Sequence, residues 1–285
     1  MRRTALAIFC FVSAVSLISC KEVSSYKPGK AVGKTEIIQY PGYELVWNDE
    51  FDVSGDPDKK KWGYELGYVR NSEPQLYVKD NAWCAKGCLI IEASYQDGVL
   101  VSSSIETKGK ADFLYGKIQA RIKIPVGSSA WPAFWTLGST RAWPDQGEVD
   151  IMEFYRYGAD LTPTVLGNAF WVAENGVDVI DDTGTVPLSY FTEQDPDWAK
   201  KFHVWTEDWN ENEIKIYVDD CLVNTIYLTQ SFNQGGEHIG ENPLRQPHYL
   251  KLNLALRGRE KDPVQPGELP MRMEVDWVRV YKQSI

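Results

Sequence analysis

The segment Lys-Ile-Gln-Ala-Arg-Ile-Lys-Ile, residues 117–124, alternates polar and apolar side chains without interruption. Side chains on a β-strand point alternately to the two faces of a sheet, so this period of two predicts a strand. The strand would place Ile118, Ala120, Ile122 and Ile124 against a core and its polar residues toward solvent. A sheet with one buried and one solvated face is typical of antiparallel structure.

Further short apolar or alternating runs follow the same pattern, and none has helical periodicity. They lie at residues 89–93, 213–218, 249–255 and 273–281. Turn signals separate them, and no repeat or Pro/Ser-rich linker divides the chain after residue 44. Many short strands predict an all-β fold, a two-sheet antiparallel sandwich or jelly roll. Residues 160–199 are polar and aromatic, and we expect a long loop there, of the size that carries function or is disordered.

Composition limits the possible functions. The 285 residues carry a formal net charge of −10, and 43% of them are hydrophobic. A sequence pI of about 4.9 argues against nucleic acid as a partner, because phosphates require a basic surface. The ordinary hydrophobicity excludes a polytopic membrane protein. The chain has 11 Trp and 15 Tyr; since a buried indole N–H needs a partner, we expect part of this set to line a groove.

The N-terminus resembles the signal segment of a bacterial lipoprotein. Residues 1–19 contain two arginines and then an apolar run too short to cross a membrane, which is typical of a signal peptide. The run ends at Leu-Ile-Ser-Cys, which resembles the lipobox in which the cysteine, here Cys20, becomes lipidated; a plain signal peptide is the alternative. Residues 20–42 are polar and predict a flexible tether. We therefore expect a lipid anchor in the outer membrane of the cell envelope, on its periplasmic or its external side.

Three cysteines, Cys84, Cys88 and Cys221, remain after the signal segment, in an oxidising compartment. The first two flank a three-residue hairpin loop, residues 85–87, with a glycine in the left-handed position. A disulfide across this hairpin and two free thiols are both open. No cysteine or histidine cluster has the spacing of a metal site. We expect structural or surface roles for the histidines, which are His203, His238 and His248.

Three carboxylates, Glu148, Asp150 and Glu153, lie within six residues of an otherwise apolar run. On a regular strand Glu153 would point away from the other two. All three share a face only if a β-bulge absorbs one extra residue within Ile151-Met152. The outer two would then be about four strand steps apart, roughly 13 Å at Cα. Side chains that lean together could close this to the ~5–5.5 Å of a retaining glycosidase pair.

The neighbouring residues favour catalysis over an acidic, solvated edge strand. Val149, Ile151 and Met152 suit a buried strand, where unpaired carboxylates are costly. Asp150 between two glutamates would raise the proton affinity of one and orient the other, leaving one ionised nucleophile and one protonated acid. The aromatic segment 131–135 comes shortly before, and aromatic rings suit the apolar faces of sugars.

On these residues the chain resembles glycoside hydrolase family 16, in its laminarinase-like branch with the bulged E-x-D-x-x-E motif. The resemblance covers residues 43–283, which we expect to form the catalytic domain. It implies a concanavalin-like β-jelly-roll sandwich with a concave substrate cleft, and retaining cleavage of internal β-linkages. No cofactor is required, and a structural calcium ion is open. Besides residues 148–153, the matching segments are 47–51, 115–121, 131–135, 252–255 and 275–281.

By motif position the resemblance implies a role for each carboxylate. Glu148 would be the nucleophile, Asp150 the assisting acid and Glu153 the general acid/base. It also implies cleft residues that bind the sugar, although Trp131 and Trp135 have rim packing as an alternative. The substrate-binding candidates are Trp131, Trp135, Asn71, Trp143, Trp171 and Arg257.

Two positions depart from the family pattern. Laminarinase-like members commonly have a His-Trp pair after the catalytic strand, whereas this chain has Asn168 in the comparable stretch and Trp171 to keep the aromatic role. A Gly-Gly usually follows the Asn-Leu-Ala strand, whereas this chain has Leu-Arg-Gly-Arg at residues 256–259. Arg257 would be either a surface cation or a contact to an acidic, sulfated or bulky sugar.

These departures leave three interpretations open. We expect a monomeric endo-β-glycosidase, most simply one that acts on β-1,3- or mixed-linkage glucan. An endo-β-galactosidase on mucin-type O-glycans or algal galactans is the alternative that the departures favour. A non-catalytic carbohydrate-binding lipoprotein is the third, because jelly rolls also serve as lectin scaffolds.

Overall fold

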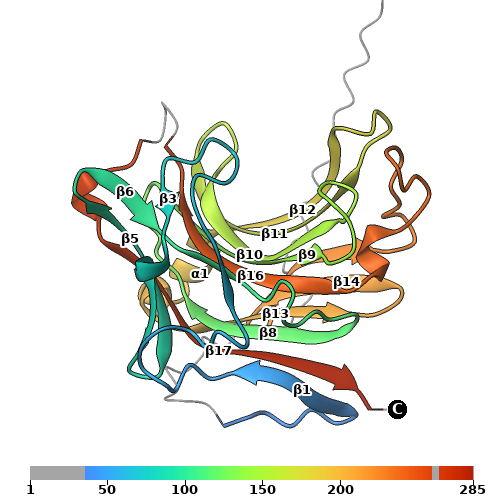
Figure 1. The fold of residues 1–285 in the computed structure, drawn as a ribbon, viewed down its shortest axis with the longest axis horizontal. Helices are drawn as coiled ribbons and strands as arrows, with labels where there is room; N and C mark the ends of the chain where they lie inside the picture. The colour runs from blue at the N-terminus through green and yellow to red at the C-terminus, as the bar shows by residue number, and fades with distance from the viewer. Residues whose placement is uncertain (1–35, 259–262, 285) are drawn as a thin grey trace, which may run out of the picture.

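Two β-sheets stacked face to face make up the protein (Figure 1). The structure, a computed structural model, describes residues 36–258 and 263–284. The predicted signal peptide 1–19, the lipidation site Cys20 and most of the tether 20–42 lie outside the described residues. From residue 43 onward, strand follows strand with little helix, so the predicted all-β sandwich is confirmed.

The sheet that carries no candidate site residue, called here the outer sheet, has ten strands. Its main path runs through β15 (Cys221–Tyr227), β14 (Glu213–Val218), β13 (His203–Trp209), β8 (Gly116–Lys123), β17 (Met271–Gln283), β5 (Cys88–Gln96), β6 (Val99–Ser102) and β3 (Leu76–Tyr77). Two further strands pair outside this path, β1 (Tyr43–Asp49) with β17 and β4 (Ala82–Ala85) with β5. Among the described strands, only β3 and β6 pair in parallel.

The second sheet, called here the cleft sheet, has seven strands, all paired antiparallel in the described part of the chain. Its order is β12 (Val179–Pro187), β11 (Thr162–Val172), β10 (Glu148–Tyr157), β9 (Ala130–Gly138), β16 (His248–Leu256), β7 (Ser104–Glu106) and β2 (Gly63–Glu65). Figure 1 shows this sheet curving over the outer sheet, with loops rising on either side of its free face.

Helical structure is short and connects strands. The single α-helix of the described residues, α1, spans Leu188–Thr192. The 3₁₀ turns are η2 (Lys79–Asn81), η3 (Trp198–Lys200), η4 (Pro243–Arg245) and η5 (Pro266–Glu268).

Strand β8 confirms the alternating pattern of residues 117–124, with one difference. Ile118, Ala120 and Ile122 are fully buried between the sheets, as predicted. The polar face is not solvated at its centre, because Gln119 and Arg121 are only 5% and 6% exposed. Neighbouring strands supply polar partners: a guanidinium nitrogen of Arg121 lies 2.7 Å from a carboxylate oxygen of Asp276, for example.

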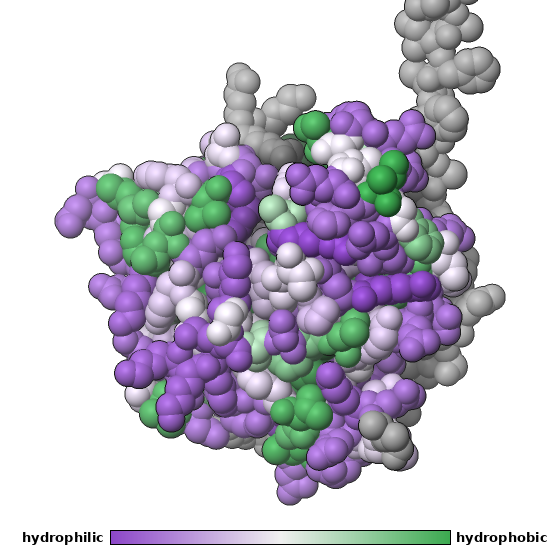
Figure 2. Space-filling view, turned by 45° about the vertical axis from the view of Figure 1, so that its right-hand side comes forward, coloured by the Kyte–Doolittle hydropathy of each residue, from purple (hydrophilic) through white to green (hydrophobic). Residues whose placement is uncertain are grey.

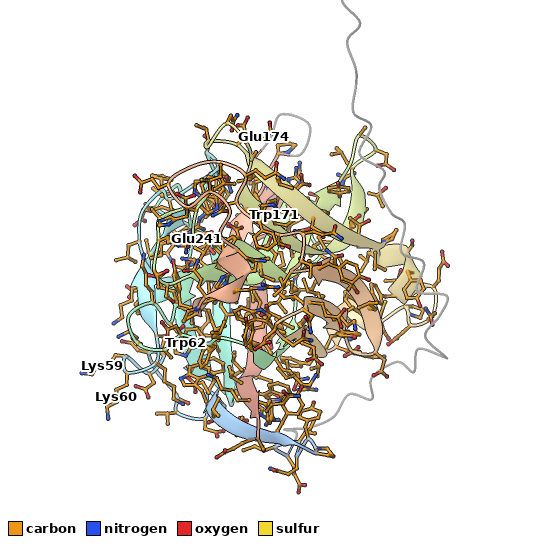
Figure 3. All side chains as sticks on the ribbon, turned by 90° about the vertical axis from the view of Figure 1, so that its right-hand side faces the viewer. Lys59, Lys60, Trp62, Trp171, Glu174 and Glu241 are labelled. Atoms are coloured by element: carbon orange, nitrogen blue, oxygen red, sulfur yellow. The ribbon has the colours of Figure 1, made fainter. Side chains whose placement is uncertain are left out.

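The indoles mainly build the core. Trp62 on the segment before β2 is 2% exposed and donates its N–H to Asp49 at 2.8 Å. Figure 3 shows Lys59 and Lys60 of the same segment projecting away from the molecule. Trp198, Trp205 and Trp209 are also almost completely buried in this core, whereas Trp277 is buried on the opposite face of the outer sheet. The high tryptophan content therefore reflects packing between the sheets more than a groove.

Residues 160–199 do not form the expected long loop. They contain β11, β12, α1 and the start of η3, and the two strands make one edge of the cleft sheet. β12 is polar because it is the outermost strand, where polar side chains discourage pairing with another chain. Its Asp181, for example, is exposed to solvent.

The hairpin between β4 and β5 excludes the disulfide that the sequence left open. Its turn has two residues, Lys86 and Gly87, both with positive φ (55° and 75°), and not three. Ala85 consequently pairs with Cys88, and Cys84 pairs with Leu89. Since alternate residues point to opposite faces of a sheet, the two thiols face away from each other. All cysteines of the described residues are free.

The histidines occupy structural or surface positions, as expected. His203 is buried, with its Nδ1 2.7 Å from an oxygen of Asp219. His248 is also buried, its Nδ1 lies 2.9 Å from the hydroxyl oxygen of Thr136, and burial lowers its pKa to about 4. His238 is partly exposed.

Glu207 on β13 is a buried acid with no counter-charge among the described residues. It is 0% exposed, and neither carboxyl oxygen has a hydrogen-bond partner in the described part of the chain. Burial, followed by the charge of Asp208, raises its pKa to about 8. The side chain is therefore neutral inside the core at pH 7, since an ionised carboxylate would be far costlier there.

We expect Glu207→Met to stabilise the protein more at pH 8 than at pH 5. The native state keeps this proton up to about pH 8, whereas the unfolded chain releases it near the ordinary value of 4.5. Native stability therefore falls as the pH rises between these values, because the unfolded state binds fewer protons. The substitution removes this loss, about 3 kcal/mol at pH 7. Urea unfolding at both pH values measures the effect.

The matched control is Glu44→Met on β1, whose side chain is exposed and which should show no such pH-dependent difference. An equal gain for Glu207→Met at pH 5 and pH 8 would contradict a raised native pKa.

Candidate active site

Strand β10 contains the bulge that the sequence predicts. Along β9, Asp150 pairs with Trp135 and Met152 pairs with Phe134, so two steps on β10 correspond to one step on β9. The pairing with β11 has the same extra residue, between Asp150 and Glu153. The prediction of one inserted residue at this place is confirmed.

The bulge brings the three carboxylates to one face. Ile151 and Met152 are both 0% exposed and belong to the core between the sheets. Glu148, Asp150 and Glu153 therefore all face the other way, onto the free face of the cleft sheet. A cavity of about 550 Å³ lies over this face, and all three carboxylates line it. Its aromatic lining residues are Trp131, Trp135, Trp143, Tyr155 and Phe170.

Two tryptophans of the predicted set hold the outer carboxylates. The Trp143 indole N–H donates to Glu148 Oε2 at 2.9 Å, and that of Trp131 donates to Glu153 Oε1 at 2.6 Å. Trp143 is 54% exposed and Trp131 is partly exposed, so both rings border the open cavity. An indole of this kind offers an apolar face to a sugar while its N–H orients a carboxylate.

Asn168 on β11 joins two of the three carboxylates. It lies directly across from Asp150, and its Nδ2 donates to Asp150 Oδ2 at 3.1 Å and to Glu153 Oε2 at 2.6 Å. The residue is 1% exposed, and its Oδ1 has no hydrogen-bond partner in the part of the chain that the structure describes. The sequence marked Asn168 as a departure from the family pattern, and the structure places it inside the carboxylate cluster.

Burial raises the pKa of all three carboxyl groups. For Glu148 the loss of hydration and the charge of Glu153 raise the pKa to about 7, and the hydrogen bond from Trp143 opposes the shift. The pKa of Asp150, which lies between the other two, is well above its usual range for the same reasons. The pKa of Glu153 is also raised by burial. At neutral pH the three groups therefore do not all carry charge, and the cluster keeps a proton available for acid catalysis.

Trp135 lines the floor of the cleft but does not offer a free stacking face. It is 5% exposed, and its N–H donates to Asn253 Oδ1 at 2.6 Å. The Arg70 guanidinium and the Lys251 ammonium each lie 5.0 Å from its ring centre. Packing, the alternative stated for this residue, describes its position.

Arg257 is not the surface cation that was one of its two expected roles. It is 6% exposed and packs 4.5 Å from the Tyr155 ring centre and 5.8 Å from that of Trp131. One of its nitrogens donates to the Arg156 carbonyl at 2.9 Å. A smaller hollow of about 230 Å³ beside Trp131 includes Arg257 in its lining.

Trp171 does not lie in the cleft, contrary to our expectation. It is 6% exposed and packs in the core between the sheets. Its neighbour Phe170 pairs with Glu148 across the strands and lines the cavity instead. The error is one residue of strand register, which moves a side chain to the other face of a sheet.

Asn71 lines the cavity, as the resemblance implies, on the segment between β2 and β3. It has a φ of 55°, and its Nδ2 donates to Glu73 at 3.2 Å. Sequence reasoning missed Arg70 next to it, which forms an ion pair with Glu65, and Lys251 on β16. A signal existed for Lys251, because a lysine inside the largely apolar run 249–255 needs a buried partner.

Neither a metal cluster nor a spanning helix is found in the described ranges, residues 36–258 and 263–284. No group of three or more His, Cys, Asp or Glu there could hold a metal ion. No helix there is long and apolar enough to cross a membrane. On the face that Figure 2 shows, hydrophilic residues predominate and hydrophobic ones lie in small separate groups.

Buried carboxylates on a bulged strand, at the floor of a jelly-roll cleft bordered by indoles, define a glycoside hydrolase. The model of glycosyl hydrolases family 16 matches residues 68–279. The chain therefore belongs to glycoside hydrolase family 16.

Individual relatives agree with this assignment. The chain is 34% identical to the β-glucanase of Rhodothermus marinus, over 99% of this chain and 95% of that protein. The structure of the laminarinase from Rhodothermus marinus matches with a TM-score of 0.72 and 33% identity, over 85% of this chain and 98% of that one. The keratan-sulfate endo-1,4-β-galactosidase of Sphingobacterium multivorum is 27% identical, over 99% of this chain and 68% of that protein.

We expect Asn168→Ala to lower kcat about tenfold and to move the alkaline limb of the pH–kcat/KM profile to higher pH. Charge-assisted hydrogen bonds of this kind contribute roughly 1.5–3 kcal/mol. The bond from Asn168 lowers the pKa of Glu153, so its loss leaves Glu153 protonated to a higher pH. Steady-state kinetics across the pH range measures both effects.

Asn175→Ala serves as the control, because Asn175 is an exposed asparagine in the turn after the same strand. An unchanged alkaline limb in Asn168→Ala would separate Asn168 from the acid/base group.

Proposed function

We propose that the protein is a retaining endo-β-glucanase that cleaves internal bonds of β-1,3- or mixed-linkage glucan. The observation that carries this proposal is the carboxylate cluster, in which both outer members accept an indole N–H at the edge of an open cavity. The similarity to a β-glucanase over nearly the whole chain supports a glucan as the substrate.

The geometry supports a distinct role for each carboxylate. Glu148 attacks the anomeric carbon while Glu153 protonates the leaving oxygen, and Glu153 then takes a proton from the water that hydrolyses the glycosyl-enzyme. Asp150, whose pKa burial and the charges of Glu153 and Glu148 raise well above its usual range, shares a hydrogen bond with Glu153 and favours a proton beside it. Asn168 fixes the orientation of Asp150 and Glu153 through its two donated hydrogen bonds. No step requires a cofactor.

An endo-β-galactosidase on mucin-type O-glycans or algal galactans is the second candidate. Two observations favour it: Asn168, in the stretch that lacks the family's histidine, donates to two carboxylates of the cluster, and the buried Arg257 borders a hollow next to Trp131. The similarity to a keratan-sulfate endo-1,4-β-galactosidase over the whole chain adds support. The same carboxylates would act, and only the sugar contacts would differ.

A substrate panel distinguishes the two candidates. The chain from residue 21 onward is incubated with laminarin, barley β-glucan, agarose, porphyran and a mucin O-glycan pool, and the products are chromatographed. We expect oligosaccharides from laminarin or barley β-glucan. We also expect the first reducing ends to keep the β configuration in proton NMR spectra, because double displacement retains configuration.

Two variants complete this experiment. Glu148→Gln should lower the rate at least about a thousandfold, because it removes the nucleophile. Glu211→Gln, at an exposed position between β13 and β14, should leave the rate unchanged. Products from a galactan or mucin alone would transfer the proposal to the second candidate. Glycan binding without any product from the wild type would leave a lectin, and early α products would overturn double displacement.

We propose that the mature protein is anchored in the outer membrane through a lipid on Cys20 and acts there as a monomer. The two arginines, the apolar run and the lipobox-like end of residues 1–19 support the anchor. The polar residues 20–42 would separate the catalytic domain from the bilayer.

We expect cells that express the full-length chain to incorporate an alkyne-labelled fatty acid into the protein and to lose this label with Cys20→Ala. The labelled protein should sediment with the outer-membrane fraction. Ser19→Ala serves as a neighbouring control that keeps the cysteine. A wild type without label would reduce residues 1–19 to a plain signal peptide.

A further inference from the structure

A row of side chains crosses the cleft sheet at the level of the catalytic carboxylates. Asp150 on β10 pairs with Trp135 on β9, Trp135 pairs with Lys251 on β16, and Lys251 pairs with Glu106 on β7. Residues paired across neighbouring strands point to the same face, here the cleft face. Strands are about 4.8 Å apart, so Lys251 lies two strands from Asp150.

Lys251 is buried in this row. Its side chain is 1% exposed, and its Nζ lies 2.7 Å from a carboxylate oxygen of Glu106 and 3.1 Å from one of Glu65. Glu65 also pairs with Arg70. Burying an ammonium group removes it from water, and its carboxylate partners must compensate for the lost hydration. Apolar side chains would therefore fill the floor of a cleft at a lower cost in free energy.

The two cations fix the indole that separates them from the carboxylates. Arg70 and Lys251 each lie 5.0 Å from the Trp135 ring centre, and the indole N–H is bonded to Asn253. The attraction between a cation and an aromatic face is stronger when the contact is removed from water. The ring is held by these cations and by the hydrogen bond at its edge, which leaves it one orientation beside Asp150.

We propose that Lys251 is a positioning residue for the nucleophile: it holds the Trp135 indole and, with Arg70, supplies the positive charge that offsets the three carboxylates. It acts through other groups and touches no reacting atom. The proposal concerns the reaction of the carboxylates and holds for a glucan or a galactan.

The charges around Glu148 agree with this role. The negative groups that face it are Asp150 and Glu153 on its own strand, and the cations are Arg70 and Lys251. From β16, Tyr249 also faces it, and burial raises the pKa of that phenol so that it stays neutral. From β11 and β9, Glu148 meets Phe170 and Leu137, which carry no charge. The two cations lower the pKa of Glu148 and oppose the effect of burial.

A purely structural role for Lys251 makes a different prediction. In that case Lys251 only neutralises Glu106 and Glu65. Removing the charges of Lys251 and Glu106 in one variant would then leave catalysis unchanged. The register distinguishes the two roles, because Lys251 lies one strand nearer to the catalytic carboxylates than Glu106 does. Deleting both charges therefore still removes a net positive influence on Glu148.

The experiment compares Lys251→Met, Lys251→Met/Glu106→Gln and Lys251→Arg with the wild type. On any polysaccharide that the wild type cleaves, we expect the double variant to lose about tenfold in kcat/KM at pH 6. Its acid limb should move up by about half a pH unit, and that of Lys251→Met by about one unit. A unit charge about two strand spacings away in a protein interior has an effect of this order. Lys251→Arg should restore most of both.

The matched control is Lys123→Met/Glu274→Gln, which removes a cross-strand lysine–glutamate pair of the outer sheet. It should change neither kcat/KM nor the acid limb. Thermal unfolding measures whether every variant is folded. Each double variant neutralises the glutamate that pairs with its lysine across the strands, so this glutamate does not remain as an unpaired charge.

A second readout does not depend on the substrate. In ¹³C-glutamate-labelled protein, the carboxyl signal of Glu148 is assigned with Glu148→Gln and titrated in each Lys251 variant. We expect its midpoint to rise in Lys251→Met/Glu106→Gln. An unchanged midpoint and a wild-type acid limb in this folded double variant would overturn the proposal. If the enzyme proved not to cleave glucan, the expected shift in the Glu148 titration midpoint would still be observed.

Discussion

The extra residue at Ile151-Met152 is the constraint on which the active site depends. If β10 were regular, Glu153 would point into the core, where its charge would be buried without a hydrogen-bond donor. Only Glu148 and Asp150 would then face the cleft. The bulge places two consecutive apolar side chains in the core and returns the third acid to the cleft. The surrounding sandwich stabilises this irregularity, because β9 and β11 pair with β10 on both sides of it.

Bringing three acids together creates an electrostatic problem that the neighbouring strands solve. β11 contributes the Asn168 amide, and Trp131 and Trp143 contribute one indole N–H each to the outer carboxylates. Further along the cleft sheet, the buried ammonium group of Lys251 contributes a positive charge at the floor of the cleft. Each donor favours the ionised form of a carboxyl group, whereas burial favours the neutral form. The balance leaves the pKa of Glu148 at about 7, so small changes in the donors shift which carboxyl group holds the proton.

Much of the fold and the grouping of the three carboxylates on one face could be predicted from the sequence, because both rest on local patterns. Alternation identified strands such as β8, and the spacing of the acids required the bulge. Contacts between distant segments left no local signal: Arg70 reaches the cleft from the segment between β2 and β3, and its partner Glu65 is visible only in the fold. Trp171 shows a second limit of local patterns. The sequence predicted this indole in the cleft, whereas it lies in the core, and the prediction was wrong by one residue of strand register.

The exposure of Trp143 has a spectroscopic consequence. Its indole is 54% exposed at the cleft, whereas those of the core, such as Trp198 and Trp205, are 0% exposed. A sugar chain that covers the ring would remove it from water and disturb its hydrogen bond to Glu148. The core indoles would keep their environment. The fluorescence of Trp143 should therefore report whether a sugar occupies the cleft. Iodide quenches an exposed indole such as Trp143 but does not reach the buried indoles of the core.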